Sequence, residues 1–63
     1  MTTFYRTDSF NPSKLWLLHR DQHGHFTLEQ QVNRRTTGVH KRVTLMWALS
    51  ATSTQSLNEW NKA

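Results

Sequence analysis

The densest group of apolar residues in the chain lies between residues 39 and 51. Its apolar positions recur every three or four residues, which is the spacing of a buried helical stripe. Every second residue from 43 to 49 is also apolar, so a strand is the competing interpretation. Thirteen residues without Gly or Pro are long for a strand and ordinary for a helix, so we predict a helix. The predicted core or dimer residues on it are Val39, Val43, Leu45, Met46, Trp47 and Leu49.

Asn11 and Pro12 form the clearest helix start in the sequence, because Asn suits the N-cap and Pro suits the first helical position. With Gly24 as a C-cap, they predict a helix over residues 12–23. The continuous apolar run that follows Pro12 shows neither the helical nor the strand period. A β-hairpin over residues 15–32, within a small α+β fold, therefore stays open as the alternative.

Two capping boxes, at residues 27–30 and 52–55, predict two further short helices. The first runs from Leu28 to about Arg35 and ends before Gly38, and the second is C-terminal and includes Trp60.

Residues 1–10 mix aromatic and polar side chains irregularly and are predicted to be an irregular arm that packs onto the core. The expected fold of residues 1–63 is thus a single small all-α domain of about four short helices.

A chain of 63 residues can bury only a small core, and without cysteine it cannot use disulfides or Cys-based metal sites. Its three tryptophans supply large apolar areas that so small a monomer would struggle to cover. We therefore expect a homodimer, formed through the helix at residues 39–51.

The net charge of +4 is concentrated in the middle of the chain. No acidic residue lies between Glu29 and Glu59, whereas four Lys and Arg residues do. This excess favours an anionic partner, which is DNA, RNA or an acidic protein surface, although a solvated face that aids solubility explains it equally well. The candidate nucleic-acid-binding residues are Arg34, Arg35, His40, Lys41 and Arg42.

A short helix, Gly38 and a longer helix follow one another in the order of a helix-turn-helix motif, whose second helix reads the major groove. Asn33 and Arg34, however, occupy places where the motif needs apolar or very small residues. The second helix is also apolar over most of its circumference. Non-specific contact of the basic residues with phosphates is therefore favoured over a true helix-turn-helix.

His19, His23 and His25 lie close together, and the first two have the i, i+4 spacing that can chelate zinc. No HExxH motif accompanies them, which favours surface histidines around a turn, so we predict no metal site and no cofactor.

The chain also lacks a Gly-x-Ser-x-Gly elbow, a Cys–His pair and a phosphate-binding glycine loop, and we predict no enzyme. No apolar run approaches the length of a membrane span and no signal sequence is evident, so we expect a cytoplasmic protein.

The ending Leu57-Asn58-Glu59-Trp60-Asn61-Lys62, with the length, basic character and lack of cysteine, resembles small accessory proteins encoded in early regions of lambdoid phages and prophages, including the exo–xis region. The resemblance implies a non-enzymatic modulator of host takeover or of the lysis–lysogeny choice, and it carries over no functional residues. We predict a small regulatory protein that contacts nucleic acid through its central basic segment. The alternative is an adaptor or inhibitor that binds a host protein through exposed aromatics such as Trp16 and Trp60.

Overall fold

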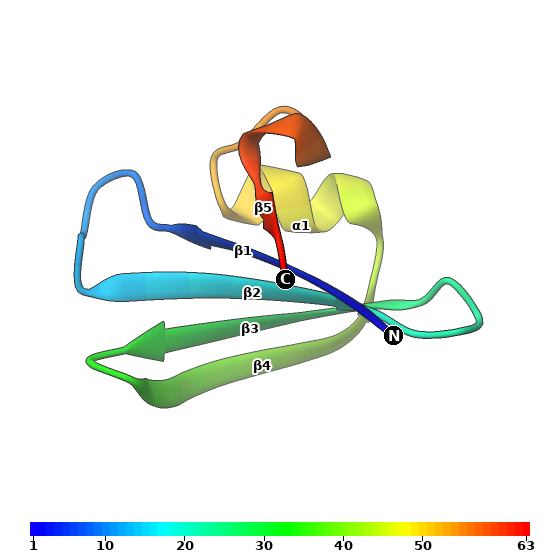
Figure 1. The fold of residues 1–63 in the computed structure, drawn as a ribbon, viewed down its shortest axis with the longest axis horizontal. Helices are drawn as coiled ribbons and strands as arrows, with labels where there is room; N and C mark the ends of the chain where they lie inside the picture. Colours follow the sequence, from blue (N-terminus) through cyan, green and yellow to red (C-terminus); the bar gives the residue numbers. More distant parts are fainter.

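The computed structural model describes residues 1–63 as one antiparallel sheet with a short helix and a 3₁₀ helix over one face (Figure 1). The order of the strands across the sheet is β4-β3-β2-β1-β5. Strands and helices follow along the chain as β1 (Thr2–Thr7), β2 (Lys14–Arg20), β3 (Phe26–Val32), β4 (Arg35–Val43), α1 (Leu45–Ala51), the 3₁₀ helix η1 (Leu57–Glu59) and β5 (Asn61–Lys62).

The prediction of an all-α domain is wrong, because most of the ordered backbone is strand and α1 is the only α-helix. The alternative hairpin over residues 15–32 corresponds to β2 and β3, which pair from Lys14↔Val32 to Arg20↔Phe26. The apolar run in β2 shows no clear period because both faces of the strand carry apolar side chains. Leu18 is fully buried beneath α1, whereas Leu17 lies half-buried on the opposite face.

The Asn-Pro signal belongs to the loop between β1 and β2 and not to a helix over residues 12–23. The side chain of Asn11 accepts a hydrogen bond from the backbone N–H of Ser13 at 3.0 Å, as in a turn. An N-cap and an Asx turn use the same side-chain oxygen, so the local sequence does not separate them. Residues 1–10 also differ from the irregular arm predicted for them, because Thr2–Thr7 form β1 and pair with β2.

The helix predicted over residues 28–35 and the helix-turn-helix interpretation are both wrong. The capping-box residue Thr27 lies on β3 opposite Lys41 of β4, so this part of the chain is a hairpin. Its two turn residues, Asn33 and Arg34, have φ angles of 52° and 68°, which is the backbone signature of a tight type I′ hairpin turn.

The segment 39–51 is divided between a strand and a helix. It pairs with β3 as far as Val43, and α1 then begins after Thr44. Thr44 has an extended backbone, and its hydroxyl accepts the backbone N–H of Trp47 at 3.0 Å as an N-cap. A cap at this position ends the strand and starts the helix, which explains why the segment showed both periods.

The C-terminal segment contains a capping box, but at Ser56 and Glu59 rather than at residues 52–55. Thr52 is buried instead, and its hydroxyl hydrogen-bonds to that of Thr54 at 3.0 Å. A single 3₁₀ turn, η1, takes the place of the predicted C-terminal helix, and the chain then returns to the sheet as β5 beside β1.

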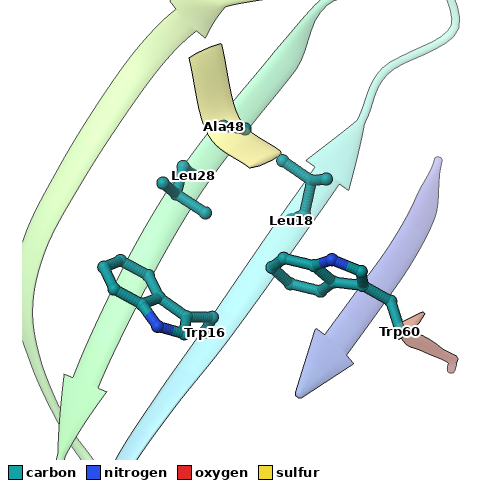
Figure 2. Close-up of a cluster of buried hydrophobic side chains, with 5 residues drawn as sticks. All are labelled: Trp16, Leu18, Leu28, Ala48 and Trp60. Carbon is teal, nitrogen blue, oxygen red and sulfur yellow. The ribbon is translucent and has the colours of Figure 1, made fainter. Parts of the chain in front are cut away.

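The core lies between one face of the sheet and the segment that contains α1 and η1. Five apolar side chains are buried in it (Figure 2): Trp16, Leu18, Leu28, Ala48 and Trp60. Half-buried apolar side chains surround them: Phe4, Phe26, Val43, Leu45, Leu49 and Leu57. Burial of each large side chain contributes about 1.5–3 kcal/mol, so these few positions carry much of the stability.

The six side chains predicted as core or dimer residues divide into two groups. Val43, Leu45 and Leu49 pack against the core of the same chain. Val39, Met46 and Trp47 are exposed, with 47%, 81% and 45% of their surface accessible. The long helix that was expected to join two copies is therefore absent, and the homodimer itself stays a prediction.

Neither helical segment has the length and apolar character that crossing a membrane would require.

Candidate nucleic-acid interface

All five residues predicted to bind nucleic acid lie on β4 or on the turn that precedes it, at one edge of the sheet. All five are exposed, and none of the four cations among them forms an ion pair. β4 contains no acidic residue. We call this set the basic edge; its members are Arg34, Arg35, His40, Lys41 and Arg42.

The basic edge carries its charge as two pairs at the two ends of β4. Arg34 and Arg35 lie at the β3–β4 turn, and Lys41 and Arg42 lie near the start of α1 (Figure 1). Arg35 and Lys41 pair with Val32 and Thr27, which are five residues apart on β3, so at about 3.3 Å per strand residue they are about 17 Å apart. The structure thus replaces the single cluster suggested by the sequence with two pairs of cations separated along an extended strand.

Two of these cations have a backbone conformation that favours glycine. The φ angles of Arg34 and Arg42 are 68° and 56°. A left-handed conformation costs a residue with a Cβ about 1–2 kcal/mol. Both arginines therefore occupy positions where the fold alone would select another residue.

Two bulges interrupt the pairing of β4 with β3. The register moves from Gly38 to Thr36 across one β3 step, and from Lys41 to Val43 across another, which leaves Thr37 and Arg42 as the extra residues. Regular pairing between the bulges covers only residues 38–41. Bulges and cations on an edge strand both oppose the addition of a further strand.

An aromatic pair lies beside the second pair of cations. His40 shares a register position with buried Leu28 and so lies on the face covered by α1. Its ring lies 5.2 Å from the ring of Trp47, at an interplanar angle of 57°. The apolar pattern predicted Trp47 as a core residue, and only its place on α1 reveals it as part of this surface.

The opposite face of the sheet has no helix over it and carries the carboxylate nearest to β4, Glu29. Hydrogen bonds from the side chains of Gln31 and Thr36 hold the pKa of Glu29 below its usual value. His19 lies 3.1 Å from the same carboxylate and 3.0 Å from the hydroxyl of Thr3. The negative charge is therefore fixed on this face, which also carries Lys41 opposite Thr27, whereas the face with His40 and Trp47 carries no carboxylate from β3 or β4.

The three histidines near the β2–β3 turn do not gather around a common point. His19 is on β2 in the network just described, whereas His23 and His25 are in the turn, where their backbone N–H groups bond to the carboxylate of Asp21. No group of three or more His, Asp or Glu side chains is placed to hold a metal ion.

The two tryptophans proposed as exposed anchors are buried. Trp16 and Trp60 each keep only 7% of their surface accessible. The indole N–H of Trp16 donates to Asp8 at 2.9 Å, and this bond is the main reason that the pKa of Asp8 is lowered. The indole N–H of Trp60 donates to Thr54. These residues therefore serve the core and not an interface.

A shallow groove of about 600 Å³ lies along α1 and differs from the basic edge in composition. It is lined by Leu45, Met46, Leu49, Ser50, Thr54 and Gln55 and contains no charged side chain.

Comparison of the chain with protein-family models, curated proteins and solved structures finds no match. We therefore infer the function from the chemistry of the surface. Four unpaired cations on β4 and the turn before it, together with His40 of β4 and Trp47 of α1, can bind a polyanion.

Proposed function

We propose that the protein is a small, non-enzymatic nucleic-acid-binding protein that contacts the phosphate backbone through its basic edge. The observation that carries the proposal is the free state of all four cations: Arg34, Arg35, Lys41 and Arg42 are exposed, unpaired and unaccompanied by any acid on β4. Lysine and arginine in such a line neutralise phosphates and release their counterions.

The strained backbone at Arg34 and Arg42 supports a role beyond solubility. Solubility needs charge somewhere on the surface but does not need it at a positive φ. Strain in a folded chain tends to gather at functional positions, where it is tolerated for the sake of the side chain that it presents. Arginine at these two positions lowers the stability of the fold and places a positive charge at each of them.

A polyanion also fits the basic edge better than an acidic peptide added as a further strand. Strand addition requires a run of regular, unpaired backbone groups on the edge. The bulges at Thr37 and Arg42 limit that run to residues 38–41. Phosphates need only the side chains, which the bulges leave exposed.

The resemblance of the C-terminal segment to early-region proteins of lambdoid phages supplies the biological setting of the proposal. In that setting the protein acts in the cytoplasm of a host cell as a regulator of host takeover or of the lysis–lysogeny choice.

The test is the salt dependence of binding to a short labelled oligonucleotide, followed by fluorescence anisotropy between about 50 and 200 mM salt. For each phosphate that the protein no longer neutralises, the slope of log K against log salt should fall by about 0.9 on a duplex and about 0.7 on a single strand. The double variants Arg34→Gln/Arg35→Gln and Lys41→Gln/Arg42→Gln each remove two cations, so each should lower the slope by about twice that amount.

Lys62 supplies a matched control for Lys41. It is exposed and unpaired too, but it lies on β5 at the opposite edge of the sheet. Lys41→Gln should lower the slope, and Lys62→Gln should leave it unchanged. Equal effects of the two variants on the slope would show that binding depends on the net charge of the protein and not on the basic edge. Failure of the wild-type protein to bind at low salt would remove the proposal and leave the host-protein adaptor as the working hypothesis.

A further inference from the structure

We infer that the basic edge takes single-stranded nucleic acid and that one unpaired base stacks on the indole of Trp47. The inference rests on the proposed function and names the form of its ligand. It is carried by the position of one aromatic ring and by that ring's exposure.

Trp47 differs from the other two tryptophans of the chain in being open to solvent. It keeps 45% of its surface accessible, against 7% for Trp16 and 7% for Trp60. Its indole makes no hydrogen bond within the chain, whereas theirs donate to Asp8 and Thr54. Unlike the other two tryptophans, Trp47 is not part of the buried core, and its indole N–H is free to contact a ligand.

The helix that carries the ring is nevertheless held in place. Ala48, the next residue, is completely buried, and Leu45 and Leu49 pack against the core on either side along α1. The backbone N–H of Trp47 is bound by the N-cap hydroxyl of Thr44. An aromatic ring on a rigid element loses little entropy when a ligand binds to it.

Cations lie near this ring at the same end of β4. His40 contacts Trp47 across the gap between β4 and α1, and Arg42 follows two residues later as the extra residue of the bulge. Lys41, between them, pairs with Thr27 and so lies at the same edge but on the opposite face of the sheet. Because the His40 ring is tilted by 57°, it does not cover the indole as a parallel plate. An aromatic platform beside a track of cations is the arrangement by which proteins bind single strands.

A duplex does not offer the indole of Trp47 a free base face. Its bases are already stacked on one another, so an indole that lies against a strand can reach them only by unstacking a step. The faces of unpaired bases are free, and each base that stacks on an aromatic side chain contributes to affinity without regard to sequence. The ligand class that uses both parts of this surface is a single strand of low sequence preference.

The experiment compares three ligands of equal phosphate number: oligo(dT), an abasic oligomer and a duplex. Wild-type protein should bind oligo(dT) about 5- to 150-fold more tightly than the abasic oligomer, the range expected for one stacked base. Trp47→Ala should reduce oligo(dT) affinity to the abasic level and leave abasic binding and the salt slope unchanged. Met46→Ala is the matched control, because Met46 is the preceding residue on α1 and is 81% exposed; it should behave as wild type.

A second measurement needs no variant. Because Trp16 and Trp60 are buried, a change of tryptophan emission on binding reports mainly on Trp47. Oligo(dT) should quench this emission and protect it from iodide, and the abasic oligomer should do neither.

The outcomes separate the two proposals. If neither polyanion binds, the proposed function itself fails. If oligo(dT) and the abasic oligomer bind equally, or if the duplex binds more tightly than oligo(dT), the basic edge binds phosphate but the stacking inference is wrong. Poly-glutamate is the last probe. If it displaces oligo(dT) and quenches the emission of Trp47 as strongly as oligo(dT) does, the stacking inference is wrong and an acidic protein is the favoured partner.

Discussion

The two hairpins that share β3 close their turns in different ways. In the β2–β3 turn, the carboxylate of Asp21 accepts the backbone N–H groups of His23 and His25, each at 2.9 Å, and glycine occupies the positive-φ position, Gly24. In the β3–β4 turn, Asn33 is followed by Arg34 at a φ of 68°, where glycine would be favoured. The first turn is built from residues that suit its backbone, and the second places a cation where the backbone is strained. Under the proposed function, the contact of Arg34 with phosphate is the reason for this difference.

The largest expected effect concerns the strand that both hairpins share. Leu28 of β3 is almost completely buried, so Leu28→Ala should destabilise the protein by about 2–5 kcal/mol through reduced burial and an unfilled cavity. Because β3 lies between β2 and β4, both hairpins should unfold together in one thermal transition followed by circular dichroism. Separate transitions for the two hairpins would contradict a common core.

The next effect tests the two turns against each other. Gly24→Ala should destabilise the fold by about 1–2 kcal/mol, because alanine resists a positive φ. Steric contact adds little, since a Cβ there would lie 3.7 Å from the nearest atom, at the end of the flexible Arg20 side chain. Arg34→Gly should stabilise the fold by about 1 kcal/mol and weaken oligonucleotide binding at the same time.

Chemical denaturation and anisotropy, measured on the same samples, check this pair of variants. Arg42→Gly should behave as Arg34→Gly does, because Arg42 also has a positive φ. An arginine-to-glycine variant that gained stability and kept its full affinity would show that the strain at that position has no link to binding.

The smallest effect is a pH dependence of the β2–β3 turn. The backbone N–H of His25, and then that of His23, lower the pKa of Asp21 below its usual value of 3.8. A carboxylate whose pKa is lowered by folding stabilises the folded state above the unfolded pKa, and this contribution is lost as the pH falls through the folded value. Exchange of the His23 and His25 amides, followed by NMR, should therefore accelerate at acid pH relative to amides of the β3–β4 turn.

Asp21→Asn supplies the control for this measurement. It keeps an acceptor oxygen but cannot titrate, so the acid-dependent difference between the two turns should disappear. Persistence of the difference in the variant would assign it to another group.

Local sequence determined several features of this protein. Gly24 has a positive φ in the β2–β3 turn, and the hairpin over residues 15–32 that stayed open as the alternative places its turn there. Asn33 also has a positive φ, but the capping box at residues 27–30 placed it within a predicted helix. The absence of acids between Glu29 and Glu59 determined that β4 would be basic whatever structure it adopted. The five residues of the basic edge could be named for that reason, since unpaired charges stay at the surface of any fold.

Only the tertiary structure decided which apolar residues are buried and which surface is free. Capping signals at Asn11 and Thr27 suit turns and strands as well as helices, and the segment 39–51 shows both periods because Thr44 divides it. The pairing of β1 with β5 supplies backbone hydrogen bonds between residues distant in sequence, such as Phe4 and Lys62, which no local spacing encodes. The packing of α1 and the C-terminal segment over one face of the sheet buries Trp16 and Trp60 and leaves Trp47 exposed beside His40.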